Sequence, residues 1–138
     1  MSALSSNYER GKNAETKAKE WLESKYNENF VKRNLPVGTK SDGTSAQHSF
    51  DLVSKDNQIV VEVKSHRLTK SGNNPSGKIS DTYHASAMLE KVNAQKKLLI
   101  LTDSDFFELF KRYSDGKISS KIELVLLNRP FARAPANP

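Results

Sequence analysis

The sequence of 138 residues contains no cysteine and no long apolar run. Without cysteine there is neither a disulfide framework nor a thiolate metal site, so carboxylates and histidines are the strong side-chain ligands that remain. A hard cation such as Mg²⁺ fits this set better than zinc. No apolar stretch approaches the roughly 18 residues of a membrane span, and the start of the chain lacks the apolar core of a signal peptide. We therefore expect a soluble, cytoplasmic protein with no membrane partner.

The length is that of one ordinary domain, which is long enough to bury a core but too short for two. Residues 1–6 are small and polar, and residues 129–138 include three prolines. We therefore expect one domain over residues 7–128 between two flexible tails. The formal net charge of +6 favours a polyanionic partner, because clustered Lys and Arg displace counterions from a phosphate backbone. The net charge alone is equally consistent with a basic protein that binds no specific partner.

The first regular element that the pattern predicts is a helix from Asn7 to about Tyr26. Its core-facing stripe recurs at helical spacing and consists of Tyr8, Gly11, Ala18, Leu22 and Tyr26. Glu15 lies within this stripe, so we expect its carboxylate on the buried side of the helix. The alternative is an ordinary solvated carboxylate, which a small rotation of the helix would produce.

The rest of the chain alternates between strand-like and helical segments. In order, we expect a short strand (29–33), a loop (36–47), a hairpin of two strands (50–53 and 59–64), a mobile loop (68–80), a helix (81–95), a buried strand (97–102), a short helix capped by Asp103 or Ser104, and a last strand (122–127). This order predicts a small α/β sandwich. Phe106, Phe107 and Phe110 of the short helix should be core; if part of this cluster is exposed, a homodimer becomes the alternative explanation.

Charged residues interrupt both strands of the expected hairpin. In the second strand, Val60, Glu62 and Lys64 share one face, and burying such charges is costly unless each has a partner or a metal. Asp51 interrupts the first strand in the same way. If Val53 lies opposite Val60, the two carboxylates face each other with Cβ atoms about 5 Å apart. A divalent cation between them would turn their repulsion into binding.

Lys64 lies one pleat along the same face, where its ammonium can orient an attacking water and stabilise charge that develops on a phosphate. Glu15 could complete the acidic cluster from the first helix. The alternative for Glu62 and Lys64 is an exposed sheet face with an ordinary charge pair.

Together these residues resemble the PD-(D/E)XK nuclease superfamily. The resemblance is carried by Gly11, Ala14, Glu15, Ala18, Trp21-Leu22, Arg33-Asn34, Phe50-Asp51-Leu52-Val53 and Val60-Val61-Glu62-Val63-Lys64. Phe50 stands where the signature has its proline. Within the superfamily, the helix and hairpin resemble the uncharacterised bacterial YraN-like group, and the layout is similar to archaeal Holliday junction resolvases and Mrr-like restriction enzymes.

The resemblance implies a restriction-endonuclease-like three-layer sandwich, in which helices flank a central mixed sheet. It implies that Asp51 and Glu62 ligate Mg²⁺ or Mn²⁺ together with the backbone carbonyl of Val63. It also implies that Lys64 acts on the nucleophilic water and that Glu15 is the helix carboxylate of the site.

Several residues are candidates for contact with nucleic acid. They are Ser65, His66 and Arg67, which leave the second hairpin strand toward the expected groove, together with Lys70 and Arg33. A surface histidine is the alternative for His66. His48 flanks the acidic residues as well and could support them, contact phosphate or act as an auxiliary base, but we favour a surface histidine for His48 and for His84. We interpret Tyr83 as a core aromatic.

The sequence thus predicts a metal-dependent endonuclease that hydrolyses phosphodiester bonds of nucleic acid in repair, recombination or restriction, and DNA is the substrate that we favour. The alternative is a non-catalytic nucleic-acid-binding module, or a subunit that works within a larger nuclease assembly.

Overall fold

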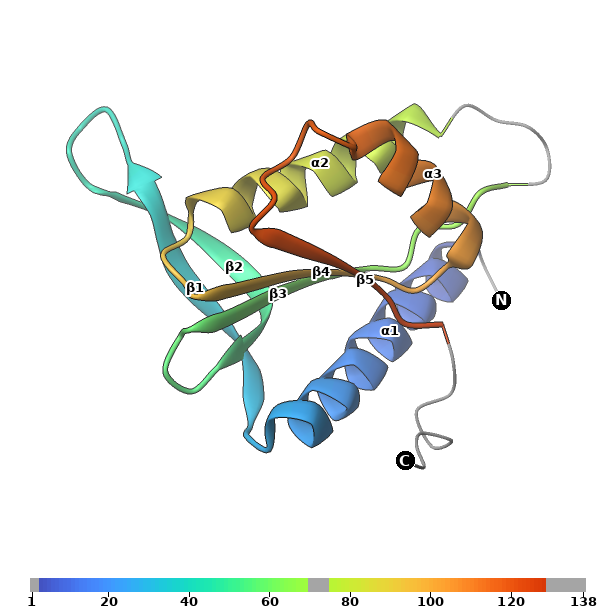
Figure 1. The fold of residues 1–138 in the computed structure, drawn as a ribbon, viewed down its shortest axis with the longest axis horizontal. Helices are drawn as coiled ribbons and strands as arrows, with labels where there is room; N and C mark the ends of the chain where they lie inside the picture. Colours follow the sequence, from blue (N-terminus) through green and yellow to red (C-terminus); the bar gives the residue numbers. More distant parts are fainter. Residues whose placement is uncertain (1–2, 70–74, 129–138) are drawn as a thin grey trace.

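The computed structural model describes residues 3–69 and 75–128 (Figure 1). Its elements are α1 (Ala3–Tyr26), β1 (Phe30–Thr39), β2 (Ser45–Ser54), β3 (Ile59–Lys64), α2 (Ser76–Lys91), β4 (Lys96–Leu101), α3 (Ser104–Ser114) and β5 (Ile122–Leu126). The five strands form one mixed sheet in the order β1-β2-β3-β4-β5. The β1–β2 and β2–β3 pairs are antiparallel, whereas the β3–β4 and β4–β5 pairs are parallel. Helix α1 covers one face and α2 and α3 cover the other (Figure 1), which is the predicted three-layer sandwich.

Two apolar layers, one on each face of the sheet, hold the sandwich together. On the α1 face, Ala18 and Leu22 pack against strands β2 to β4. On the other face, Leu89 of α2 packs with the buried phenylalanines of α3. Residues 98–101 of β4 are at most 1% exposed because both layers cover this strand, as its unbroken apolar run predicted. Full burial of each such side chain contributes roughly 1.5–3 kcal/mol.

Helix α1 begins earlier than predicted, and its residues 7–9 are exposed. It starts at Ala3, so residues 3–6 are helical and do not form a loose tail. Tyr8, expected in the buried stripe, is 69% exposed. The reason is geometric: Arg10 already contacts the backbone of Ser65, which follows the end of β3, so the turn before Arg10 lies beyond that strand. The stripe prediction was correct for Ala18 and Leu22.

The segment predicted as a loop over residues 36–47 is largely strand. Strands β1 and β2 pair from Phe30 opposite Ser54 to Thr39 opposite Ser45, and their far end projects beyond the rest of the sheet (Figure 1). The polar composition misled the prediction because backbone pairing, rather than apolar burial, holds this part of the hairpin. Pro36 is tolerated because β1 is an edge strand of the sheet.

Helix α2 spans Ser76–Lys91 rather than 81–95. Its first turns are polar and carry no apolar periodicity, so residues 76–80 were predicted as part of a mobile loop. Pro75 precedes the helix, and Val92 ends it in an extended conformation. No helix in the described parts of the chain is both long and apolar enough to cross a membrane. Residues 129–138 of the predicted C-terminal tail lie outside the described residues.

Helix α3 agrees with its prediction. The Asp103 carboxylate accepts a hydrogen bond from the Phe106 amide at 2.9 Å, which is the expected N-cap. Phe106 and Phe110 are fully buried, and Phe107 packs against the same core. The phenylalanine cluster is therefore core, and it gives no support to a homodimer.

Candidate active site

An irregularity in the β1–β2 pairing sets the position of Asp51. Val31 pairs with Val53 and Arg33 pairs with Phe50, so a step of two positions along β1 corresponds to a step of three positions along β2. As a result Phe50 and Val53 pack in the same apolar layer, although regular alternation would separate them. Such bulges re-aim side chains next to functional sites. Here the two residues between them are Asp51 and Leu52, and Leu52 packs in the apolar layer on the α1 face.

The predicted register of the β2–β3 hairpin is confirmed, because Val53 lies opposite Val60. Leu52 opposite Val61 is the last pair in this direction. Beyond it, Asp51 Oδ2 accepts a hydrogen bond from the Val63 amide at 2.8 Å. A side-chain carboxylate thus takes the place of a backbone acceptor where the two strands separate. This brings the carboxylate of Asp51 to the carboxyl-terminal end of β3.

Glu62 is buried next to this carboxylate. It is 4% exposed, and its pKa is raised to about 8 by burial first and by the negative charge of Asp51 second. The nearby ammonium of Lys64 and the Asp51 backbone amide act in the opposite direction. The carboxyl group therefore keeps its proton near neutral pH unless further positive charge approaches.

His48 is part of this site, so its interpretation as a surface histidine was wrong. Its Nε2 lies 3.3 Å from Glu62 Oε2, and its ring packs edge-on against Phe50 with centroids 4.6 Å apart. Burial lowers the pKa of the imidazole, with the nearby His84 acting in the same direction. His84 itself is exposed, as predicted.

Glu15 extends the acidic region on the α1 side. Its pKa is raised by burial and then by the negative charge of Asp51, while Lys32 and Lys64 lower it. Lys32 Nζ also lies 3.6 Å from Asp51 Oδ1. The negative charge of Asp51 therefore raises the pKa of both Glu15 and the buried Glu62.

The oxygen atoms gathered here suit a hard divalent cation. Mg²⁺ in proteins binds through one or two carboxylates and retains several waters. Asp51 and Glu62 provide two carboxylates; burial first and the charge of Asp51 second raise the pKa of Glu62, and a cation would offset the second of these effects. Within residues 3–69 and 75–128, no three His, Asp or Glu side chains form a group that could hold a metal ion. The role of Glu15 as a third ligand therefore stays a prediction.

Lys64 is held by a residue that sequence reasoning missed. Its Nζ lies 2.9 Å from Asp81 Oδ2, and the same oxygen lies 2.7 Å from His66 Nε2. Burial raises the pKa of Asp81, but the hydrogen bonds from Lys64 and His66 outweigh it and leave the pKa below its usual value. Lys64 and His66 are two positions apart in extended chain, a spacing that indicates a shared partner, but no local pattern identifies Asp81 in a later helix.

The remaining candidates for nucleic-acid contact have different surroundings. The His66 ring packs edge-on against Phe106 with centroids 5.5 Å apart. Arg33 Nη1 donates to the Ser54 carbonyl and to Asn57 Oδ1, both at 2.8 Å, and so braces the β2–β3 turn. Lys70 lies outside the described residues. Contacts of these residues with nucleic acid stay predictions.

Two further expectations concern Tyr83 and Ser65. Tyr83 packs against Phe110 and donates from its hydroxyl to the Tyr113 carbonyl at 3.0 Å, which confirms it as a core aromatic. The Ser65 carbonyl accepts a hydrogen bond from Arg10 Nε at 3.3 Å, so α1 contacts the chain just beyond Lys64.

Comparison with known families decides what kind of domain this is. A family model described as the nuclease-related domain matches residues 10–122. The chain belongs to the nuclease-related domain family. This family lies within the PD-(D/E)XK-like nuclease superfamily, so the resemblance drawn from the sequence is confirmed at that level. No curated protein and no solved structure gave a significant match.

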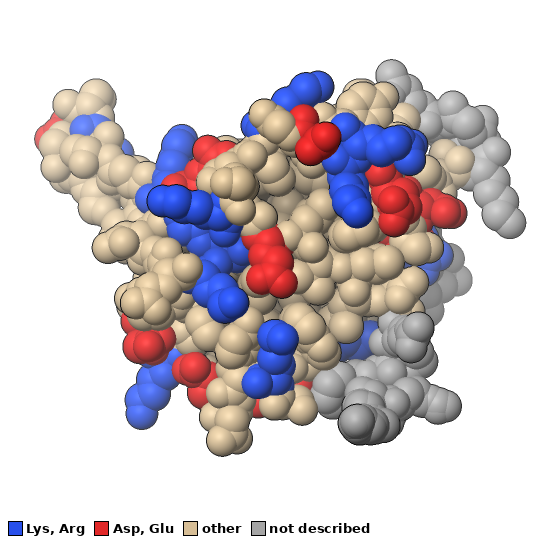
Figure 2. All heavy atoms as spheres, viewed as in Figure 1, with Lys and Arg blue, Asp and Glu red and all other residues tan. Residues whose placement is uncertain are grey.

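The matched segment of the nuclease-related domain contains the whole candidate site, from Glu15 in α1 to Asp81 in α2. Its surface charge is mixed. On the face shown in Figure 2, Lys and Arg side chains gather in several separate groups with Asp and Glu groups between them. The net charge of +6 is therefore not concentrated in one uniform basic surface on this face.

Proposed function

We propose that this nuclease-related domain is a metal-dependent endonuclease that hydrolyses phosphodiester bonds of DNA. The observation that supports this most strongly is the arrangement at the point where β2 leaves β3. There Asp51 reaches the backbone of β3 beside the buried Glu62, with Lys64 on the same strand. In metal-dependent phosphodiester hydrolysis, a pair of carboxylates can bind the cation, and an ammonium group can stabilise the charge that develops on the phosphate.

Asp51 and Glu62 would hold Mg²⁺ or Mn²⁺, with the Val63 carbonyl as a further oxygen donor. When bound, the cation supplies Lewis-acid polarisation of the phosphate and lowers the pKa of an attacking water. Glu62 gives up its proton as the cation approaches, because added positive charge lowers the pKa of a carboxyl group. The Lys64 ammonium, oriented by Asp81, stabilises the charge that develops on the phosphate.

A second function, non-catalytic binding of nucleic acid, is favoured by one observation. The described residues contain no ready group of three metal-ligating side chains. In this alternative the domain keeps its fold and its basic side chains, and the carboxylates have a structural role only. The domain would then bind nucleic acid by itself or as a subunit of a larger nuclease assembly. The weakness of this alternative is Glu62, because a buried carboxyl group beside another carboxylate destabilises a fold that has no use for it.

Cleavage assays separate the two functions. Labelled duplex, branched and single-stranded DNAs would be incubated with the parent protein in Mg²⁺, in Mn²⁺ and in EDTA. We expect cleavage of at least one DNA with the metal and none with EDTA. Asp51→Asn should abolish cleavage, whereas Asp105→Asn, an equal change of charge at an exposed position on α3, should not. DNA binding by the parent protein without cleavage under any of these conditions would support the non-catalytic function.

A further inference from the structure

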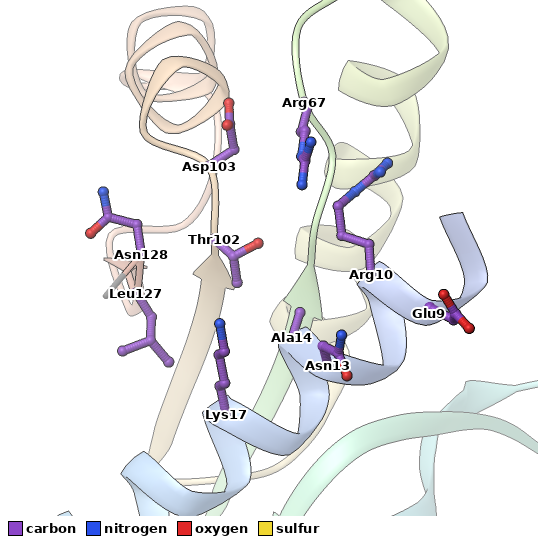
Figure 3. Close-up of a pocket in the computed structure, with 10 residues that line it drawn as sticks. All are labelled: Glu9, Arg10, Asn13, Ala14, Lys17, Arg67, Thr102, Asp103, Leu127 and Asn128. Atoms are coloured by element: carbon purple, nitrogen blue, oxygen red, sulfur yellow. The ribbon is translucent and has the colours of Figure 1, made fainter. Parts of the chain in front are cut away.

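A cavity of about 580 Å³ lies at the carboxyl ends of three parallel strands, and its lining includes Ala14, the chain neighbour of Glu15. Residues that follow β3, β4 and β5 line it from the sheet side, and α1 lines it from the other (Figure 3). In open α/β sheets, ligands bind outside the carboxyl ends of the parallel strands. The cavity therefore occupies the place where this architecture forms binding sites.

Three cationic side chains line the cavity: Arg10, Lys17 and Arg67. Figure 3 shows Lys17 reaching up from α1 and Arg67 reaching down from the segment after β3, toward the space beside Thr102. Arg10 is held in place, because Nε donates to the Ser65 carbonyl at 3.3 Å and Nη2 donates to Asn7 Oδ1 at 3.0 Å. The cavity thus combines the fixed guanidinium group of Arg10 with the Lys17 ammonium and the Arg67 guanidinium, for which the described residues give no side-chain hydrogen bond.

Within the described residues, neither acidic residue of the lining forms a salt bridge with these cations. Asp103 keeps its charge, but its Oδ2 accepts a hydrogen bond from the Phe106 amide at the start of α3. Glu9 is exposed, and its carboxylate points away from the other lining residues (Figure 3). No described residue forms a salt bridge with Lys17 or with Arg67. Positive charge converges on this space without a partner from the described part of the protein.

We propose that this cavity binds a phosphate group of nucleic acid adjacent to the phosphodiester that is cleaved. The Asn13 amide and the Thr102 hydroxyl add neutral donors to the lining, and phosphate oxygens accept from both kinds of donor. The proposal rests on the proposed function for its relation to the site. Arg67 follows Lys64 by three positions, a span of at most about 11 Å between Cα atoms, so one strand of nucleic acid can occupy both places.

The first test uses inorganic phosphate and does not depend on cleavage. Amide resonances of the full-length protein would be followed by NMR during titration with phosphate in EDTA. We expect saturable shifts at Asn13 and Thr102, and roughly tenfold weaker binding in Lys17→Gln, since one charged hydrogen bond is lost. Lys12→Gln is the matched control, because Lys12 is an exposed lysine of the same helix that does not line the cavity. Equal phosphate binding in the two variants, or shifts that do not saturate, would overturn the proposal.

Two sources of the phosphate, a strand end and an internal backbone position, are separated by a second measurement. Binding of short DNA strands with a 5′-phosphate, a 3′-phosphate or hydroxyl ends would be compared by fluorescence anisotropy in EDTA. If one terminal phosphate increases the affinity of the parent protein, and this increase disappears in Lys17→Gln, the cavity binds the phosphate at a strand end. Equal affinity for all strands, weakened by Lys17→Gln but not by Lys12→Gln, indicates an internal phosphate. If Lys17→Gln and Lys12→Gln bind every strand with equal affinity, the cavity binds neither a terminal nor an internal phosphate.

Failure of this inference is distinguishable from failure of the proposed function. If the parent protein binds phosphate through Lys17 but cuts no DNA, phosphate binding by the cavity is supported and the proposed nuclease activity is contradicted. If the parent protein cuts DNA and Lys17→Gln has the same KM and kcat as Lys12→Gln, the cavity has no part in substrate binding. We expect a raised KM with kcat little changed, because the cavity binds the substrate away from the reacting atoms.

Discussion

The Glu62 carboxyl group lies almost completely out of contact with water, next to a second carboxylate. Burial and the neighbouring charge both favour its protonated form, so its pKa rises from 4.5 to about 8. In the unfolded chain the same group ionises near its ordinary pKa. The folded metal-free protein therefore holds a proton that the unfolded chain releases between these two pKa values, and this difference makes stability depend on pH.

We predict that the free energy of unfolding of the metal-free protein falls as pH rises from about 5 to about 8. The contribution of Glu62 is fully present below its unfolded pKa and is lost as pH rises through its folded pKa, at about 1.4 kcal/mol per pKa unit of difference. Glu62→Gln should flatten this dependence, because glutamine keeps the shape and does not titrate. Urea denaturation in EDTA across this range measures it. Parent and variant curves that stay parallel at every pH would contradict the prediction.

Single residues were predictable where they broke a pattern. Asp51, Glu62 and Lys64 stood out because charges interrupt strands that are otherwise apolar, and the register of Val53 with Val60 followed from that pattern. Residues that act through tertiary contacts were not predictable. His48 and Asp81 lie in segments whose local sequence is ordinary, and their partners come from other elements.

At the scale of elements, β2 and α1 determine how the site is built. The irregular pairing of β2 with β1 frees Asp51 to reach β3. Helix α1 lies close to the end of β3, where Gly11 faces Ser65. A side chain at position 11 would have its Cβ 3.9 Å from Ser65 Oγ, which is an ordinary contact distance. Glycine is therefore not required there for space.

We predict that Gly11→Ala stabilises the protein by about 0.5–1 kcal/mol. Alanine loses less backbone freedom than glycine when the helix forms, and position 11 is interior to α1. A higher urea midpoint with an unchanged m-value would show this. A lower midpoint would mean that α1 has to approach the end of β3 more closely than the structure shows.

The long hairpin and helix α2 show which element boundaries the sequence could not predict. Residues 36–47 are polar because one edge of the β1–β2 hairpin faces solvent, so their strand conformation depends on backbone pairing between distant positions. The first turns of α2 are polar as well, and they lack the apolar spacing from which a helix is recognised. By contrast, β4 was predictable because burial on both faces leaves a continuous apolar run.

At the scale of the whole molecule, the net charge of +6 favours binding to a polyanion and makes that binding depend on salt concentration. We predict that DNA binding in EDTA weakens steeply with added salt and varies little with base sequence, because Lys and Arg displace counterions from phosphates. Anisotropy titrations over a series of salt concentrations give the slope of log K against log salt. A flat response would indicate that the basic groups seen in Figure 2 are not used to bind nucleic acid.

The claim on which this account depends is that Asp51 and Glu62 together hold a divalent cation, and calorimetric titration with Mn²⁺ tests it directly. The parent protein and the control Asp105→Asn should both bind Mn²⁺ saturably at neutral pH and release protons, because Glu62 is protonated before the cation binds. Asp51→Asn should fold and show no such binding. If the parent protein shows no saturable signal, or if Asp51→Asn binds Mn²⁺ as the parent does, Asp51 and Glu62 do not form a metal site.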